Sequence, residues 1–249
     1  MIAASEPMLA RSATWTYLRD SEMRFDMPAI YIYDGQGFLV RKSLNLANAR
    51  GLDGATICVS SGTTTELNLA DWFRTNRLRY TPVVSAAREQ NIANLEAGRC
   101  DAYTNERGGL AANRAALPRP DDYVVLADVI SKEPLGPYVR QDDPRFRDIV
   151  GWTLHVLVAA EEFGLTQANV AEAARSHPSP EVARLLGRTG EFGAKLGLGN
   201  DWALKAIAAV GNYGEMFDRN LGAGSRIGLD RGPNRLWNQG GLLYAPPFR

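Results

Sequence analysis

A glycine and a run of hydroxyl side chains occupy residues 60–66, which read Ser-Ser-Gly-Thr-Thr-Thr-Glu. The apolar run at 55–59 before them predicts a buried strand, and the Leu, Ala, Trp and Phe pattern after them predicts an amphipathic helix. The first turn of a helix leaves N–H groups unpaired at the positive end of the helix dipole, so this turn can hold a carboxylate or a phosphate. The same residues also fit a structural role, in which Thr63 and Glu66 form a capping box. On this motif alone both interpretations stay open.

Arg19 and Glu106 are further candidates for ligand binding. Arg19 follows the hydroxyl-rich stretch 14–16, and a guanidinium group beside hydroxyls suits the bidentate capture of a carboxylate. Glu106 ends the predicted strand at 100–105, level with the Gly-Thr turn if the strands are parallel, and there its carboxylate would meet an ammonium group. The structural alternatives are a surface arginine beside Asp20 and a glutamate that complements a helix dipole.

The histidines and glycines give little support for an enzyme. The chain has 2 histidines, His155 in the apolar middle of a predicted helix and His177 in a loop. Neither can be placed beside a serine or cysteine nucleophile with support from strands or loops. The glycines at 222–224 and 240–241 follow no predicted strand and so carry no dinucleotide fingerprint. We therefore expect no catalytic residues and no cofactor.

The two cysteines, Cys58 and Cys100, cannot form a metal cage. Both fall in predicted strands, as two buried thiols or as one bridge between neighbouring strands. In a βαβαβα block with right-handed crossovers, the first and third strands can lie side by side. Parallel neighbours are about 4.8 Å apart, which a disulfide can span. A bridge is therefore feasible if the protein is exported, and the sequence alone does not choose between the two states.

The charges are balanced, with 28 Lys and Arg against 28 Asp and Glu. This balance gives no net field to attract nucleic acid or an acidic membrane, and we expect no nucleic-acid partner. No apolar run approaches the roughly 18 residues that a membrane-spanning helix needs. Residues 1–7 lack the basic and apolar regions of a signal peptide, which predicts a cytoplasmic protein if Met1 is the true start. The alternative is a start or a cleaved leader that lies upstream of Met1.

Strands and helices are predicted to alternate between residues 52 and 116. The strands are expected at 55–60, 79–84 and 100–105, and the helices at 64–75, 87–97 and 107–116. Such alternation predicts an α/β fold with a parallel sheet covered by helices on both faces. We expect one lobe at 43–137 and another made of 1–42 and 138–249, with a ligand bound between them at the carboxyl ends of the strands.

The second of these lobes is expected to contain strands at 29–33 and 37–40 and helical pieces after residue 143, including 181–187 and 191–196. Asp143-Pro144 predicts the start of a helix over 144–163, and a further helical stretch is expected at 200–219. The tail from residue 222 is rich in glycine and proline with single aromatic residues. We expect these aromatic side chains to pack onto the lobe.

Several blocks of sequence occur in an order typical of one family. They are 14–16 (Thr-Trp-Thr), 33–38 (Tyr-Asp-Gly-Gln-Gly-Phe), 52–56 (Leu-Asp-Gly-Ala-Thr), 62–71, 97–101 (Ala-Gly-Arg-Cys-Asp), 130–137 (Ile-Ser-Lys-Glu-Pro-Leu-Gly-Pro), 211–215 (Gly-Asn-Tyr-Gly-Glu) and 244–249 (Tyr-Ala-Pro-Pro-Phe-Arg). On these blocks the chain, from about Leu9 to Arg249, resembles the periplasmic solute-binding proteins of ABC amino-acid importers, in their general L-amino-acid-binding branch.

The resemblance implies the α/β fold of type II periplasmic binding proteins, with two lobes of helix-covered sheets that close on an L-amino acid by hinge motion. It implies a periplasmic location and a membrane permease as partner. The ligand-binding residues carried over by position are Ser12, Thr14, Arg19, Thr63, Thr64 and Glu106.

The implied roles of these residues divide between the lobes. Arg19 would hold the α-carboxylate of the ligand, with Ser12 and Thr14 adding hydroxyls or amides from the same lobe. Thr63 and Thr64 would supply donors from the other lobe. Glu106 stands where the family has an aspartate that clamps the α-ammonium group, so its carboxylate reaches about one carbon further into the pocket, where hydrogen-bond geometry is steep.

A second departure lies in the lobe made of 1–42 and 138–249, which corresponds to lobe one of the family. The family's chains begin with a signal peptide and with the first strands and helices of this lobe, and this sequence starts after them. We therefore expect a truncated lobe one, in which the strands at 30–40 lack sheet neighbours and leave an open edge and an uncovered apolar face that favour self-association. The alternative to a transport subunit is a non-transport interaction module or a degenerate paralogue that no longer binds amino acids.

Overall fold

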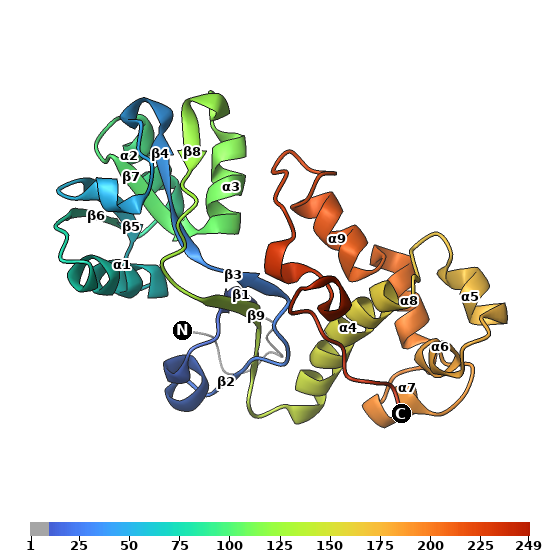
Figure 1. Cartoon of the computed structure of the whole chain (residues 1–249). Helices are drawn as coiled ribbons and strands as arrows, with labels where there is room; N and C mark the ends of the chain where they lie inside the picture. Colours follow the sequence, from blue (N-terminus) through green and yellow to red (C-terminus); the bar gives the residue numbers. More distant parts are fainter. Residues whose placement is uncertain (1–9) are drawn as a thin grey trace. The chain divides into compact units, whose positions relative to one another are not determined.

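The computed structural model describes the backbone of residues 10–249 and the side chains of residues 13–249. The chain divides into two compact units (Figure 1). Unit 1 holds the chain up to Tyr33 together with Pro134–Ser225 and Asp230–Arg249. Unit 2 holds Asp34–Glu133 and Arg226–Leu229. The first boundary thus lies before the strand at 36–41, which the sequence analysis had assigned to the other lobe.

Unit 2 is built on a five-stranded sheet in the order β6-β5-β7-β4-β8. Its strands are β4 (Gln36–Arg41), β5 (Thr56–Ser60), β6 (Thr81–Ser85), β7 (Ala102–Glu106) and β8 (Tyr123–Val125). β5 pairs with β6 and with β7 in parallel, as predicted. β4 lies outside the block at 52–116 for which a parallel sheet was predicted, and it is antiparallel to both β7 and β8, so the whole sheet is mixed. The expectation that the strands at 30–40 lack sheet neighbours is wrong for β4, which has a partner on each side. β4 runs in the opposite direction because it begins beside the end of β7, with Gln36 opposite Glu106.

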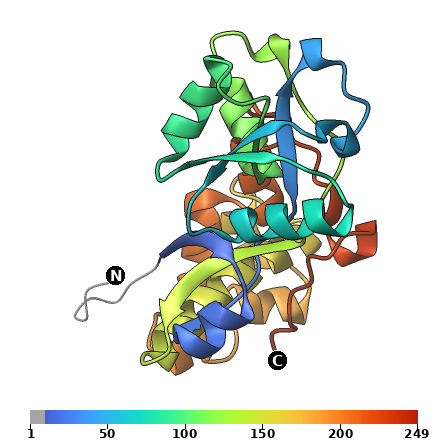
Figure 2. The same cartoon turned by 90° about the vertical axis from the view of Figure 1, so that its left-hand side faces the viewer.

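Three helices cover this sheet, α1 (Thr64–Thr75), α2 (Arg88–Glu96) and α3 (Arg107–Ala116) (Figures 1 and 2). Alternate residues of a strand point to opposite faces, so each strand contributes to two apolar clusters. The cluster under α1 is formed by Phe38, Val40, Ala49, Leu52, Ile57, Val59, Leu69, Phe73, Ala102 and Leu126. The cluster under α2 and α3 is formed by Leu39, Cys58, Leu95, Cys100, Tyr103, Leu110, Leu117 and Tyr123. The helices therefore cover both faces of the sheet, as predicted.

Cys58 and Cys100 form a disulfide with a Cα–Cα distance of 5.7 Å. Cys58 lies in β5, and Cys100 lies two residues before β7, which pairs with β5. Both residues are buried. Of the two states that the sequence left open, the structure therefore contains the bridge.

Unit 1 contains a small sheet in which β9 (Glu133–Arg140) pairs with β1 (Ala10–Thr14), β2 (Phe25–Asp26) and β3 (Ile32–Asp34). β3 ends at Asp34 and β9 begins at Glu133, so two boundaries between the units fall inside these two strands. The helices of this unit are α4 (Pro144–Glu162), α5 (Val170–Ser176), α6 (Pro180–Leu185), α7 (Phe192–Leu196), α8 (Trp202–Val210) and α9 (Tyr213–Asn220).

Local features explain where α4 and α9 begin and where α8 ends. α4 starts as predicted, with Pro144 in its first turn and the Asp143 carboxylate accepting from the Phe146 N–H at 2.9 Å. The single helical stretch predicted at 200–219 is wrong, because Gly211 has φ +82° and ends α8. Asn212 then starts α9 with a capping box. α4 packs against both α8 and α9.

The prediction that the aromatic side chains of the C-terminal tail pack onto the lobe holds for Phe248, which is buried, and is wrong for Trp237 and Tyr244, which are exposed. The ring of Phe248 lies 5.1 Å from that of Trp152, measured between centroids, and the Phe248 carbonyl accepts from Arg184 Nε at 2.8 Å. Leu236 and Leu243 are buried. Among the described helices, not one combines the length and the apolar character that a membrane crossing requires.

Replacing Cys58 and Cys100 together by alanine is expected to lower the free energy of unfolding. The bridge joins residues 42 apart in the sequence. Closing a loop of this length removes chain entropy from the unfolded state, which stabilises the protein by about 4 kcal/mol. Denaturant unfolding of the wild type and the double variant measures the difference. Reductant should destabilise the wild type and leave the double variant unchanged, and equal stability of all samples would contradict the prediction.

Candidate functional site

One edge of the unit 2 sheet brings together three of the six residues that the sequence marked for ligand binding. β5 and β7 are parallel neighbours, so the residues that follow them lie at the same edge of the sheet. Thr63 and Thr64 follow β5, and Glu106 ends β7. The structure therefore brings the Gly-Thr turn and Glu106 to one edge, as the sequence predicted.

Thr63 is the N-cap of α1. Its hydroxyl accepts from the Glu66 N–H at 3.2 Å and donates to the Ser60 carbonyl at 2.8 Å. The predicted capping box is only half present, because Glu66 accepts from the Gly62 N–H at 2.8 Å rather than from the N-cap residue itself. Gly62 has φ +67°, a conformation that glycine adopts without strain. The turn is therefore a capped helix start, and Thr64 is the first residue of α1.

Gln36 is a buried residue of this edge that the sequence analysis missed. Its Nε2 donates to the Thr65 carbonyl and to the Thr104 hydroxyl, both at 2.9 Å. The Thr104 hydroxyl in turn donates to the Gly37 carbonyl at 2.8 Å. Gln36 thus ties the first turn of α1 to β4 and β7. Gln36 lies in the block at 33–38, which the sequence analysis used only as evidence for the family and not as a source of site residues.

A second buried polar group supports α1 one turn further along. Glu133 is 1% exposed, and its Oε1 accepts from Asn68 Nδ2 at 2.9 Å and from the Ser131 hydroxyl at 2.7 Å. The same Ser131 hydroxyl accepts from the Gln36 N–H at 3.3 Å. The polar contacts therefore run from α1 through Glu133 to the start of β4.

Glu106 is held in an environment that disfavours its charge. Burial raises its pKa above the ordinary value of 4.5, and the carboxylates of Glu133 and Asp34 raise it further, against a backbone hydrogen bond and the Arg88 guanidinium, which lower it. Burial also raises the pKa of Asp34, against hydrogen bonds from the Gly108 and Gly35 N–H groups that favour its ionised form. An ammonium group placed beside Glu106 would offset this cost, because an opposite charge favours the ionised carboxylate.

Arg19 and Thr14 lie together in unit 1. Thr14 ends β1 and is buried, and its carbonyl accepts from Arg19 Nη1 at 2.7 Å and also from the Tyr138 hydroxyl. The Arg19 guanidinium lies over the Tyr138 ring, 5.9 Å from its centroid. Arg19 belongs to the short π-helical turn η1 (Leu18–Glu22). Ser12 lies in β1, and its side chain falls outside the described residues.

Two cavities open in unit 1 beside Trp15. One, of about 340 Å³, has Asp20, Asp26 and Arg147 in its wall. The other, of about 210 Å³, is lined mainly by apolar and aromatic side chains, including Tyr31. His155 borders both, burial lowers its pKa, and its ring lies 5.7 Å from that of Trp152. His155 is thus a neutral wall residue at physiological pH. Within residues 13–249, no group of three or more His, Cys, Asp or Glu side chains is placed to hold a metal ion.

Replacing Glu106 by glutamine is expected to raise the free energy of unfolding near neutral pH. The raised pKa means that the folded state holds this proton more tightly than the unfolded chain. Stability from Glu106 is therefore present at acid pH and is lost as pH rises through the folded-state pKa. The neutral amide of glutamine removes that loss. The difference in the free energy of unfolding between Glu106→Gln and the wild type should therefore shrink as pH falls toward 4.5, where Glu106 becomes protonated in both states.

Urea unfolding of both proteins across this pH range is the measurement. Glu89→Gln, an exposed position in the first turn of α2, is the matched control and should show no such gain. A Glu106→Gln protein that is less stable than wild type at neutral pH would contradict the prediction.

Comparisons with known proteins show what the chain is similar to. No family model matches it. It is 54% identical over 242 residues to the glutamate/glutamine/aspartate/asparagine-binding protein of Rhodobacter capsulatus, covering 97% of this chain and 72% of that protein. It is 53% identical over 244 residues to the general L-amino acid-binding periplasmic protein of Rhizobium johnstonii, covering 97% of this chain and 71% of that protein.

A solved structure agrees with these sequences. The ABC transporter periplasmic binding protein from Brucella ovis, with glutathione bound, matches with a TM-score of 0.93 and 48% identity, covering 95% of this chain and 75% of that chain. This match confirms the predicted periplasmic-binding-protein fold. The chain belongs to the family of amino-acid-binding periplasmic proteins of ABC transporters.

Proposed function

We propose that this chain binds an L-α-amino acid between its two units by hinge closure and delivers it to the membrane permease of an ABC importer. The observation that carries the proposal is the edge of the unit 2 sheet, where the N-terminus of α1 and Glu106 lie side by side. An α-amino acid carries one carboxylate and one ammonium group. The helix N-terminus suits the carboxylate and Glu106 suits the ammonium.

Arg19 supplies the second contact to the α-carboxylate in this proposal. Its hydrogen bond to the Thr14 carbonyl and its stacking on Tyr138 hold the guanidinium in one orientation before a ligand arrives. Such pre-organisation reduces the entropy lost on binding. Thr14 and Ser12 complete the contacts from unit 1 to the ligand, and Thr63 and Thr64 supply the hydrogen-bond donors from unit 2.

The identity of the ligand is proposed from chemistry and from relatives. The relative from Rhodobacter capsulatus is named for glutamate, glutamine, aspartate and asparagine, and the Brucella ovis structure holds glutathione. The glutamyl residue of glutathione has the same free α-amino and α-carboxylate groups as an amino acid. Amino acids of this acid and amide group, together with glutathione, are therefore the first ligands to test.

The protein is proposed to act by binding alone, without catalysis, and in the periplasm as the name of the Rhizobium johnstonii relative states for that protein. The permease would recognise the closed form, because closure is the conformational change that a ligand brings about in such proteins. Pairing of two copies through a sheet edge of lobe one is proposed as a route to oligomers. Light scattering across a concentration series distinguishes a monomer from such a pair.

Replacing Arg19 by alanine is expected to weaken amino-acid binding about tenfold or more, because a bidentate charge-assisted pair contributes about 1.5–3 kcal/mol. Calorimetry with L-glutamate, L-glutamine, L-aspartate, L-asparagine and glutathione measures the affinities. Arg175→Ala is the matched control, since Arg175 makes an exposed ion pair with Glu172 in α5.

Equal affinity of the wild type and Arg19→Ala would remove Arg19 from the site. No heat from the wild type with any of these ligands would favour the non-transport interaction module instead. Thermal melting of each variant shows whether a loss of affinity comes from unfolding.

A further inference from the structure

Two side chains from distant parts of the sequence hold the backbone just before the first boundary between the units. Asn234 accepts from the Tyr33 N–H at 2.7 Å and donates to the Tyr33 carbonyl at 3.0 Å, so one amide pairs with the strand as a neighbouring strand would. The Tyr213 hydroxyl donates to the Tyr31 carbonyl at 2.7 Å. Tyr33 is the last residue of unit 1 before the chain enters unit 2 at Asp34.

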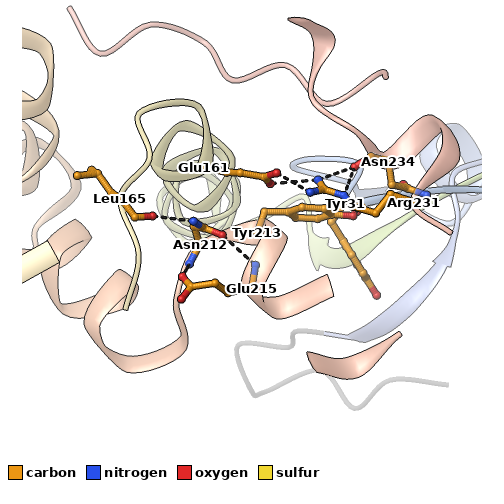
Figure 3. Close-up of polar contacts among 8 residues, drawn as sticks. All are labelled: Tyr31, Glu161, Leu165, Asn212, Tyr213, Glu215, Arg231 and Asn234. Carbon is orange, nitrogen blue, oxygen red and sulfur yellow. Dashed lines mark hydrogen bonds and ion pairs between the residues drawn. The ribbon is translucent and has the colours of Figure 1, made fainter. Parts of the chain in front are cut away.

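Arg231 fixes Asn234 in this position (Figure 3). Its Nε and Nη2 donate to the Asn234 carbonyl at 3.1 and 2.7 Å. Its Nη1 and Nη2 form a bidentate ion pair with Glu161 of α4, and the two side chains are 22% and 14% exposed. The guanidinium also lies over the Tyr213 and Phe217 rings, 5.3 and 5.6 Å from their centroids. Two parallel hydrogen bonds fix the relative orientation of the guanidinium and the carboxylate, so this ion pair holds Arg231 in one geometry.

Tyr213 is fixed independently by the start of α9. Asn212, which is 6% exposed, donates to the Leu165 carbonyl at 2.7 Å and forms the capping box with Glu215 (Figure 3). Tyr213 is the next residue, so its ring and hydroxyl are placed by a rigid helix end. Residues 211–215 form one of the family blocks found in the sequence, and the proposed ligand contacts leave them without a role.

Arg231 and Asn234 lie just after a short tail segment that belongs to unit 2. Arg226–Leu229 cluster with unit 2, and the chain returns to unit 1 at Asp230. Arg231 and Asn234 follow this return, and Asn234 contacts the strand at Tyr33. The first crossing and the tail crossing are thus joined within unit 1 by one buried side chain, since Asn234 is 4% exposed.

We propose that Asn234, Arg231 and Tyr213 are positioning residues for ligand-induced closure, which clamp the first crossing strand and so set the hinge geometry. The expected effect on ligand affinity rests on the proposed function, whereas the effect on the ligand-free protein does not. A clamped strand limits the orientations that the two units sample without ligand. A loosened strand admits orientations that cannot close, and the apparent affinity falls in proportion to the fraction that can.

The test measures the distance between the units directly. Spin labels on Arg74→Cys in α1 and Lys205→Cys in α8, both exposed, report the distribution of that distance while Cys58 and Cys100 stay bridged. In the labelled background, Asn234→Ala and Tyr213→Phe are each expected to broaden the distribution without ligand. The same variants should lower the affinity for the tightest-binding of the five ligands above by about fivefold or more. Tyr213→Phe keeps the ring under Arg231, so it removes only the bond to Tyr31.

Asn220→Ala is the matched control, because Asn220 is exposed and donates only within its own helix, to the Met216 carbonyl. It should leave both readouts unchanged. An unbroadened distribution in folded Asn234→Ala and Tyr213→Phe overturns the inference, whatever the affinity. If the wild type binds none of the five ligands, the proposed function fails, and the ligand-free distribution still decides the inference. Should Asn234→Ala not fold, Tyr213→Phe and Asn234→Asp, which keeps the acceptor for the Tyr33 N–H, decide it instead.

Discussion

The parallel pairing of β5 with β7 is the constraint on which the rest of unit 2 depends. It brings the turn after β5 and the end of β7 to one edge, so that the α1 N-terminus and Glu106 become neighbours. It also brings Cys58 close enough to Cys100 for a bridge. Strand side chains alternate between faces, so a slip of one residue would turn Cys58 toward the wrong face and move the turn away from Glu106. The disulfide therefore fixes the same register that the candidate site requires.

Features that arise from neighbouring residues were predictable from the sequence. The strand at 55–60, the helix at 64–75 and the capping by Thr63 and Asp143 each depend on contacts within a few residues. The break between α8 and α9 was missed although it is local, because Gly211 can lie within a helix or end one, and the apolar pattern continues across it.

Features that depend on distant partners were not predictable in the same way. β4 looked like a member of the other lobe because nothing in residues 36–41 identifies β7 and β8 as its partners. Gln36 meets partners 29 and 68 residues away, and Asn234 meets Tyr33 across 201 residues. A buried amide looks like any surface amide until the fold brings its partners together. Family resemblance supplied the candidate ligand residues but said nothing of the polar side chains that hold them.

The partly buried carboxylate of Glu106 at the unit 2 edge gives a reason why a zwitterion would suit this edge better than an anion. The α1 N-terminus favours a negative group. At Glu106, burial above all and then the carboxylates of Glu133 and Asp34 disfavour negative charge, and the Arg88 guanidinium offsets this only in part. A ligand with a carboxylate alone would gain at the helix and lose at Glu106. An α-amino acid brings a positive group to the carboxylate whose ionisation the fold makes costly, and it brings its negative group to the helix end. Under the proposed function, selectivity for the α-amino acid head group thus follows from the unit's own unfavourable electrostatics, and the side-chain pocket needs to supply only the preference among amino acids.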